Sequence, residues 1–369
     1  MPISSRRIVA SAGALSLVVA GLAFAATPAH AATFPVTNEN DSGEGSLREA
    51  LIDAEASAGP DDITFAPGVD SIVLTSVLPV VDHPVRILGP GIDALTIDAP
   101  GTVFTVAGPA IQIAVTISGM TLTSDEGGAD GINSLNADLT VEQVRASHFD
   151  EHGIYLTEGS LWLTSAITNN NLVGTFYNSN RIAVITDLTA NENVNTGFTS
   201  YSTNSAATSI TVTGGEFDDN EGWGGALYFG SGTLTIDGVS ATGNQFGWSV
   251  SAVDDATASI SNSDFFDNQN YGLRVASQYD GTSVTGSGNT ATGNIYGLDL
   301  VTTDTATIDL STSVVENNEQ GVQIEASDAS TVTLRDARVE LNGTEDEQGG
   351  GIVVESADEI GRASCRERG

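Results

Sequence analysis

The stretch Asn268-Gln-Asn-Tyr-Gly272-Leu-Arg-Val275 decides the fold, because its pattern returns again and again along the chain. In each copy an Asn is followed, after two or three positions, by a Gly and a short alternating strand. The glycines at positions 247, 272, 297 and 321 recur at nearly constant steps. A regular period of this length is the signature of a solenoid.

Looser copies extend the pattern in both directions. Toward the N-terminus the corresponding glycines are Gly225, Gly197, Gly174, Gly153 and Gly131, and toward the C-terminus the pattern recurs at Gly351. The period therefore covers more than half of the chain.

Each period contains three short strands. The first follows the glycine, as in Leu273-Arg-Val275, the second resembles Ala258-Ser-Ile260, and the third resembles Ser263-Asp-Phe-Phe266. Strict alternation places one face inside and one outside. Three strands per turn, joined by Asn, Asp, Gly and Ser corners, predict an all-β, right-handed parallel β-helix solenoid, since parallel crossovers are almost always right-handed.

Three other repeat architectures fit the sequence less well. Leucine-rich repeats share the period but need a denser leucine framework than these Thr, Ser, Val and Ile alternations provide. Left-handed hexapeptide helices would repeat at every sixth position, and propeller blades repeat at about 40–45 residues.

One Asn of each period is expected to lie at a corner. Asn tolerates left-handed backbone, and its amide can bond the Asn one turn above and below. The Gly that follows admits a dihedral angle or a close approach that a Cβ would prevent. The predicted structural ladder consists of Asn171, Asn193, Asn220, Asn244, Asn268, Asn294, Asn318 and Asn342.

Residues 1–31 have the features of a secretory signal. Arg6 and Arg7 precede an apolar run, and Ala29-His-Ala31 forms a small-residue cleavage site. We favour the general secretory route over twin-arginine export, and we expect a secreted or cell-surface protein cleaved near Ala31. No further apolar run approaches the roughly 20 residues of a membrane span.

Residues 32–60 are expected to form an N-terminal cap. Ser46-Leu-Arg-Glu49 fits a capping box, in which Glu49 reaches back to Ser46. Leu47, Ala50, Leu51 and Ala54 form an apolar stripe at helical spacing, while Arg48, Glu49, Asp53 and Glu55 are expected to face outward. A solenoid must cover its first turn, because bare strand edges pair with other chains.

Residues 61–359 are expected to form the β-helix. Phe34-Pro-Val-Thr through Gly45-Ser-Leu-Arg-Glu-Ala-Leu51, followed by Asp62-Ile-Thr-Phe65 and Ile87-Leu-Gly-Pro-Gly-Ile92, resembles the opening of bacterial secreted β-helix proteins of the pectin-lyase-like superfamily. The resemblance is closest to surface proteins with a GSLREA-type lead-in, related to polymorphic outer membrane proteins. It is tight from Phe34 to Ile92 and generic beyond. It implies a surface-anchored or adhesin-like protein without an established enzyme activity.

Residues 360–369 depart from the pattern. Three of the twelve basic residues, Arg362, Arg366 and Arg368, fall close together here, with the single cysteine, Cys365, between them. A nucleotide sequence that encodes Ile360–Arg368 resembles a common sequencing-library adapter. We therefore predict that this segment is not native and that the natural chain is truncated here and continues with further turns.

The composition excludes several classes of partner. The 369 residues include 48 acidic and 12 basic residues, which gives a formal net charge of −36, and every basic residue is Arg. Such a surface repels nucleic acid and anionic membranes. With the tail excluded there is no cysteine, so stacked hydrophobic turns must hold the fold without disulfides. We expect a monomer when the chain is complete.

Polysaccharide-active β-helices supply a template for catalytic candidates. Hydrolases use two carboxylates, and lyases use an acidic calcium cluster and a base. Asp218-Asp219 and Asp254-Asp255 are paired acids, and Arg274 lies on a strand. The paired acids lack a Gly-His-Gly partner, and we see no acid cluster one turn away from Arg274. We therefore interpret the four aspartates as solvated corner residues.

One local cluster of side chains is a candidate metal site. His148, Asp150, Glu151 and His152 are metal-capable ligands that precede Gly153. The alternative is a polar corner in which Asp150 replaces the ladder Asn. No motif in the sequence indicates a cofactor. Acidic residues stacked at successive corners are compatible with weak calcium binding.

Aromatic residues near the repeated pattern provide a binding hypothesis. Rings one turn apart could form a platform for sugar rings or a partner protein, or could fill the core. The candidates are Trp223, Tyr228, Trp248, Tyr271 and Tyr296.

These features favour a secreted or cell-surface recognition or scaffold protein of adhesin type without catalysis, with a polysaccharide or surface protein as its partner. The alternative is an extracellular polysaccharide lyase or glycoside hydrolase. Assays for new reducing ends and unsaturated products would distinguish the two.

Overall fold

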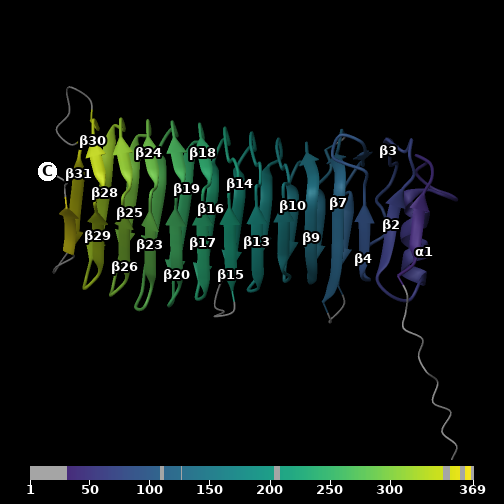
Figure 1. Cartoon of the computed structure of the whole chain (residues 1–369), viewed down its shortest axis with the longest axis horizontal. Helices are drawn as coiled ribbons and strands as arrows, with labels where there is room; N and C mark the ends of the chain where they lie inside the picture. Colours follow the sequence, from purple (N-terminus) through teal and green to yellow (C-terminus); the bar gives the residue numbers. More distant parts are fainter. Residues whose placement is uncertain are drawn as a thin grey trace, which may run out of the picture.

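The computed structural model describes residues 31–108, 112–125, 127–202, 208–343, 350–357 and 362–366, with side chains described as far as residue 354. Its strands stack in chain order along one axis as a right-handed parallel β-helix of about eleven turns (Figure 1). The fold predicted from the repeat is confirmed. The predicted signal segment lies almost entirely outside the described residues.

Three parallel sheets form the sides of the solenoid, here named sheet A, sheet B and sheet C. Sheet A contains β1 (Thr33–Val36), β2 (Asp61–Phe65), β3 (Ser71–Val73), β4 (Val85–Leu88), β5 (Thr96–Asp98), β7 (Ile113–Thr123), β9 (Ala137–Ser147), β11 (Leu161–Thr164), β13 (Ile182–Thr186), β15 (Ser209–Thr213), β17 (Thr233–Asp237), β20 (Thr257–Ser261), β23 (Ser283–Ser287), β26 (Thr307–Ser311), β29 (Thr331–Arg335) and β32 (Arg362–Arg366).

Sheet B contains β6 (Phe104–Ala107), β8 (Asp130–Leu135), β10 (His152–Thr157), β12 (Val173–Asn178), β14 (Thr196–Ser202), β16 (Trp223–Gly230), β19 (Phe246–Val253), β22 (Tyr271–Ser277), β25 (Tyr296–Thr302), β28 (Gln320–Ser327) and β31 (Ile352–Ala357). Sheet C contains β18 (Ser240–Thr242), β21 (Asp264–Phe266), β24 (Thr290–Thr292), β27 (Val314–Glu316) and β30 (Arg338–Glu340).

The core consists of aliphatic side chains stacked from turn to turn. In sheet A, Ile236 lies between Val212 and Ile260 in the ladder register, and all three are buried. The residues between them alternate outward, which is why the sequence reads with a period of two. Each turn therefore buries its apolar face against its neighbours, so the fold needs no disulfide.

The helix α1 (Leu47–Ala56) lies at the N-terminal end of the stack, beside β1 and β2 (Figure 1). The Ser46 hydroxyl accepts a hydrogen bond from the Glu49 amide at 3.2 Å. The reciprocal half of the predicted capping box does not form, because the Ser46 amide donates to the Gly43 carbonyl at 3.1 Å. The predicted apolar stripe is buried: Leu47, Ala50, Leu51 and Ala54.

Arg48 does not simply face outward from α1. Its guanidinium donates to a carboxylate oxygen of Asp41 at 2.6 Å and to the carbonyls of Ser76 and Val77 at 2.9 and 2.6 Å. These hydrogen bonds tie the helix to the first turns, and the bond from Arg48 holds the pKa of Asp41 below its usual value.

The ladder asparagines do not themselves adopt the left-handed backbone conformation that the sequence analysis expected of them. Positive φ occurs at the preceding residue, for example at Asp219, Asp267 and Asn317 with φ of 54°, 50° and 57°. A left-handed residue turns the chain sharply at this corner, and Asn, Asp or Gly accept that conformation at low cost.

The repeated glycines are required by close approach. A Cβ on Gly174 would lie 2.4 Å from the Gly197 carbonyl oxygen of the next turn. In the turn of β16 the equivalent residue is Gly224 rather than the predicted Gly225. Gly225 instead makes room for the indole of Trp248, whose ring would lie 2.4 Å from a Cβ there.

The backbone of β32 pairs with β29 and continues sheet A. Pairing with the last strand of a ladder requires only backbone groups. The predicted non-native origin of residues 360–369 therefore stays a prediction. Among the described residues, no helix is long and apolar enough to cross a membrane.

Candidate functional site

A pocket of about 940 Å³ opens at the corner where the chain passes from sheet B to sheet A, beside β10 to β13. Its lining is dominated by amide and hydroxyl side chains, with one acid, one Arg and one aliphatic side chain. Ile182 is 45% exposed. The lining residues are Asn136, Thr157, Glu158, Ser160, Asn178, Ser179, Asn180, Arg181 and Ile182.

The outer face of sheet B next to this pocket carries exposed aromatic rings. Tyr201 is 50% exposed, and its ring stacks on that of Tyr228 with centroids 5.0 Å apart. Tyr177 pairs in register with Ser200, so Asn178 of the pocket and Tyr201 occupy neighbouring positions on adjacent strands. Tyr201 therefore lies one strand away from the pocket residue Asn178 on sheet B, a position that sequence reasoning missed.

The predicted aromatic platform is only partly present. Trp248 is a correction, because it is fully buried and packs edge-to-face against Phe217 with centroids 5.0 Å apart. Burial follows from the alternation in β19, which directs Trp248 inward over Gly225.

Of the other predicted rings, Tyr228 stacks on Tyr201, and the remaining three form a row with Phe246 on the outer face of sheet B. Trp223, Phe246, Tyr271 and Tyr296 stack in succession with centroids 4.4, 6.0 and 5.1 Å apart. Rings so close and nearly parallel cover one another's faces. The row therefore presents mainly ring edges and hydroxyl groups, and only its two terminal rings keep a face that no ring of the row covers.

His152 forms a dyad with Asp130 on the same face of sheet B. Its Nδ1 lies 2.8 Å from an Asp130 carboxylate oxygen, and the other oxygen accepts from the Asn133 amide at 2.7 Å. Asp130 is buried and His152 is partly buried. The His152 ring lies 4.8 Å from that of Tyr155, which stacks on Phe176 at 5.0 Å. A carboxylate that orients an imidazole is a common acid–base arrangement.

The metal-capable cluster differs from the predicted one. Ligand atoms of Asp130, Glu151 and His152 lie within 4.8 Å of one another, whereas His148 and Asp150 do not belong to this group. His148 has a φ of 68° and precedes Phe149, whose amide donates to the ladder Asn171 at 3.0 Å. Phe149, rather than Asp150, therefore occupies the ladder position of that turn.

Asp218 and Asp219 occupy corners rather than a two-carboxylate site. The Asp218 carboxylate accepts from the Thr242 amide at 2.9 Å, and burial raises its pKa. Asp219 takes the left-handed position before Asn220.

Asp254 and Asp255 lie at a different corner, between β19 and β20. Both are exposed and left-handed, with φ of 52° and 64°. Each pair of aspartates therefore helps to form the backbone turn at its own corner.

Arg274 has the acidic partner that the sequence reading did not find. Asp299 pairs with it in register one turn later, and Arg274 Nε lies 3.3 Å from an Asp299 carboxylate oxygen. The guanidinium also lies 5.5 Å from the centroid of Tyr271. Asp299 is only 3% exposed, and burial raises its pKa to about 6 although Arg274 opposes the shift. Adding one period of the repeat to Arg274 would have identified it.

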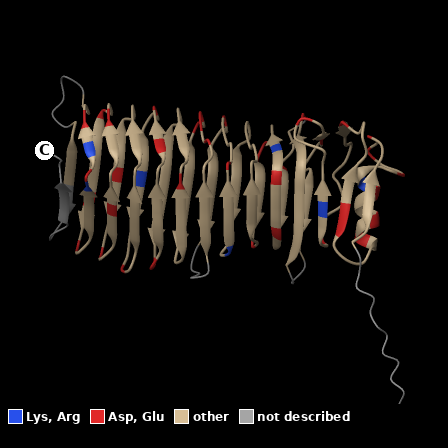
Figure 2. Ribbon diagram, in the orientation of Figure 1, with Lys and Arg blue, Asp and Glu red and all other residues tan. Residues whose placement is uncertain are grey.

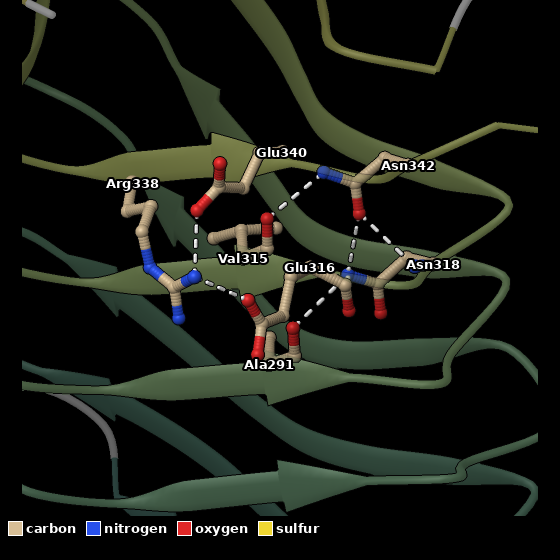
Figure 3. Close-up of polar contacts among 7 residues, drawn as sticks. All are labelled: Ala291, Val315, Glu316, Asn318, Arg338, Glu340 and Asn342. Atoms are coloured by element: carbon tan, nitrogen blue, oxygen red, sulfur yellow. Dashed lines mark hydrogen bonds and ion pairs between the residues drawn. The ribbon is translucent and has the colours of Figure 1, made fainter.

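The eight ladder asparagines form a column at the corner that precedes sheet B, and all of them except the partly buried Asn342 are buried. From Asn193 to Asn342, each side-chain amide donates to the next side-chain carbonyl at 2.8–3.0 Å. Figure 3 shows the last step, where Asn318 donates to Asn342 and also to the Ala291 carbonyl. Beside it, Arg338 bridges Glu316 and Glu340 at 2.7 and 2.6 Å (Figure 3). The column is structural.

Comparison with known proteins supports the same fold. Residues 165–313 match the family model described as a right handed beta helix region. No curated protein sequence matches this chain. The A-module of mannuronan C-5 epimerase AlgE6 from Azotobacter vinelandii is 15% identical with a TM-score of 0.51, and the match covers 87% of this chain and 97% of that one.

Two further solved structures align less closely. The A-module of mannuronan C-5 epimerase AlgE4 from Azotobacter vinelandii is 13% identical with a TM-score of 0.45, covering 86% of this chain and all of that one. The catalytic domain of a GH87 alpha-1,3-glucanase is 13% identical with a TM-score of 0.44, covering 86% of this chain and 68% of that one. At these identities the likeness concerns the fold alone. The strand topology and the match to the family model identify the chain as a right-handed parallel β-helix protein.

Proposed function

We propose that this protein binds a glycan outside the cell, as a recognition or scaffold protein of adhesin type without catalysis. The observation that carries the proposal is the corner pocket of about 940 Å³. Its amide and hydroxyl groups can donate and accept hydrogen bonds, as sugar hydroxyls require. Ile182 and the neighbouring Tyr201 add apolar contact for the carbon face of a sugar ring.

The test is a glycan array followed by titration with the oligosaccharide that binds best. Asn178→Ala and Arg181→Ala, which remove pocket donors, should each weaken binding about tenfold, since a lost hydrogen bond to a ligand costs on the order of 1.4 kcal/mol. Gln278→Ala changes the same corner at a distant turn and is the matched control. Absence of glycan binding, or pocket variants that bind like the parent, would contradict the proposal.

The His152–Asp130 dyad supports a second candidate, a polysaccharide lyase or glycoside hydrolase. His152 is the first residue of β10, whose last residue, Thr157, lines the pocket, and Asp130 lies opposite it on the adjacent strand β8. A glycan that crosses the strand could place a bond beside the imidazole. New reducing ends or unsaturated products that disappear in His152→Ala would establish catalysis and replace the adhesin proposal.

Secretion with cleavage near Ala31 remains part of the proposal, as does the absence of nucleic acid and anionic membrane partners. It is supported by the signal-like N-terminal sequence and by the net charge of −36. N-terminal sequencing of the exported protein would test the cleavage position.

A further inference from the structure

Further along the stack from the corner pocket, the outer face of sheet B carries a charged pair surrounded by rings. Arg274 on β22 and Asp299 on β25 face each other across adjacent turns, and Tyr271 and Tyr296 stack beside them. Arg274 is 40% exposed along its side chain, while the Asp299 side chain is 5% exposed. Among the outward positions of the described part of sheet B, Arg274 is the only Arg.

This pair differs from an ordinary surface ion pair elsewhere on the same molecule. On sheet A, Arg86 and Asp62 also pair across adjacent turns, but through two hydrogen bonds of 2.7 and 2.6 Å. Arg274 Nε lies 3.3 Å from an Asp299 carboxylate oxygen, and among the described residues the Arg274 side chain makes no hydrogen bond, so its terminal nitrogens can act as donors to a ligand. A buried carboxylate with one long contact is poorly compensated, and such groups are concentrated at functional sites.

We propose that Arg274 and Asp299 form a second saccharide subsite that binds adjacent hydroxyl groups of a neutral sugar unit. Arg274 supplies the donors, Asp299 supplies the acceptors, and the hydroxyl groups of Tyr271 and Tyr296 border the site. The inference rests on the proposed glycan binding, and it specifies the chemical class of the ligand.

Charge favours a neutral ligand over an acidic one. A second carboxylate, Glu325 on β28, lies near enough to Asp299 to raise the pKa of Asp299 further. An acidic sugar would meet this local excess of negative charge and a protein of net charge −36. Neutral hydroxyl groups meet no such repulsion.

The site should depend on pH near 6. The charged and titratable groups around Asp299 are Arg274, Glu325 and Tyr271. Burial raises the pKa of Asp299 to about 6, so the carboxylate accepts from sugar hydroxyls at pH 7.5 and is largely protonated at pH 5. Binding at this subsite should therefore weaken as the pH falls.

The experiment is a calorimetric titration of the full chain with short neutral glucan oligosaccharides and a galacturonate oligosaccharide of the same length. Arg274→Gln and Asp299→Asn should each weaken neutral binding about tenfold at pH 7.5, the effect of one lost charge-assisted hydrogen bond. Arg86→Gln, which removes the matched pair on sheet A, should bind like the parent. The parent at pH 5 should approach the affinity of Asp299→Asn.

Three results would overturn the inference: unchanged affinity in Arg274→Gln, an equal loss in Arg86→Gln, or tighter binding of the galacturonate. The pocket variants, measured in parallel, separate this inference from the proposed function. Loss of binding in Asn178→Ala and Arg181→Ala alone would support the pocket and overturn the second subsite. Loss of binding in Arg274→Gln and Asp299→Asn alone would support the second subsite and contradict the role of the pocket.

Discussion

At the scale of single residues, Asn268 shows how a ladder asparagine combines burial with several hydrogen bonds. The Asn268 amide donates to Asn294 and to the Ala241 carbonyl, and its carbonyl oxygen accepts from both the backbone and the side chain of Asn244. Asn268 is 2% exposed. Removing it would leave several buried groups without partners, and each such group costs about 1–3 kcal/mol.

Asn268→Ala should therefore lower the free energy of unfolding by about 3–5 kcal/mol. The measurement is urea denaturation followed by circular dichroism. Gln269→Ala, at the exposed neighbouring position, is the matched control and should stay within about 0.5 kcal/mol of the parent. Equal stability of the two variants would show that the column contributes little.

Asp299 makes a second prediction at this scale, and its sign is unusual for an acid. Its pKa is about 6 in the folded state, above the unfolded value of about 3.9, so the folded state binds the proton more tightly. Its contribution to stability is therefore greatest at low pH and is lost as the pH rises through 6. The difference corresponds to at most about 3 kcal/mol.

Asp299→Asn should consequently stabilise the fold at pH 7.5 and change little near pH 4. Urea denaturation of parent and variant at both pH values measures this difference. Asp62→Asn, on the exposed pair of sheet A, controls for the loss of one carboxylate. A larger gain at pH 4 than at pH 7.5 would contradict the assignment.

At the scale of elements, α1 closes the N-terminal end of the stack. Its buried face consists of four apolar side chains, and Arg48 fixes it to the loop at residues 76–77. Without this cover, the first turn would expose its apolar interior, and removal of β1 as well would free the edge of β2, with which β1 pairs.

Deleting residues 33–60 should therefore produce aggregation, measured by light scattering after size-exclusion chromatography. The control is replacement of the exposed Asp53 and Glu55 by Ala, which keeps the helix and should leave the association state unchanged. A soluble monomer after the deletion would contradict the capping role.

At the scale of the whole molecule, the charged residues are unevenly distributed over the surface. Acidic residues gather at the corners and strand ends, whereas the outward positions of sheet A between β11 and β23 are mainly Thr and Ser (Figure 2). Because the net charge is −36, repulsion among the corner carboxylates opposes the compact state.

The thermal midpoint should therefore rise when NaCl is raised from about 10 mM to 150 mM, as the Debye length falls from about 30 to 8 Å. Choline chloride at the same ionic strength should give the same increase. A midpoint insensitive to salt would contradict the repulsion argument. An extra increase with calcium at matched ionic strength would instead indicate bound calcium, with Asp130, Glu151 and His152 as the first ligands to mutate.

The solenoid can be predicted from the sequence alone, because alternation sets which side chains face inward and the recurring Asn-Gly pattern sets the length of one turn. The sequence also placed the strands of most turns, the apolar stripe of α1 and the column of asparagines. These features depend on residues close together in the chain or on a repeated position, so periodicity is sufficient to find them.

Which side chains meet between turns depends on how the turns stack in three dimensions. Asp130 meets His152 of the following turn, and Arg274 meets Asp299 in the same way, because the length of each corner sets the register of the next strand. In the regular turns one period locates such a pair, as for Arg274 and Asp299, whereas the turn from Asp130 to His152 has a different length and the period misses that pair. Trp248 likewise became a core residue because the preceding turn offers it Gly225, a vacancy visible only when the turns are stacked.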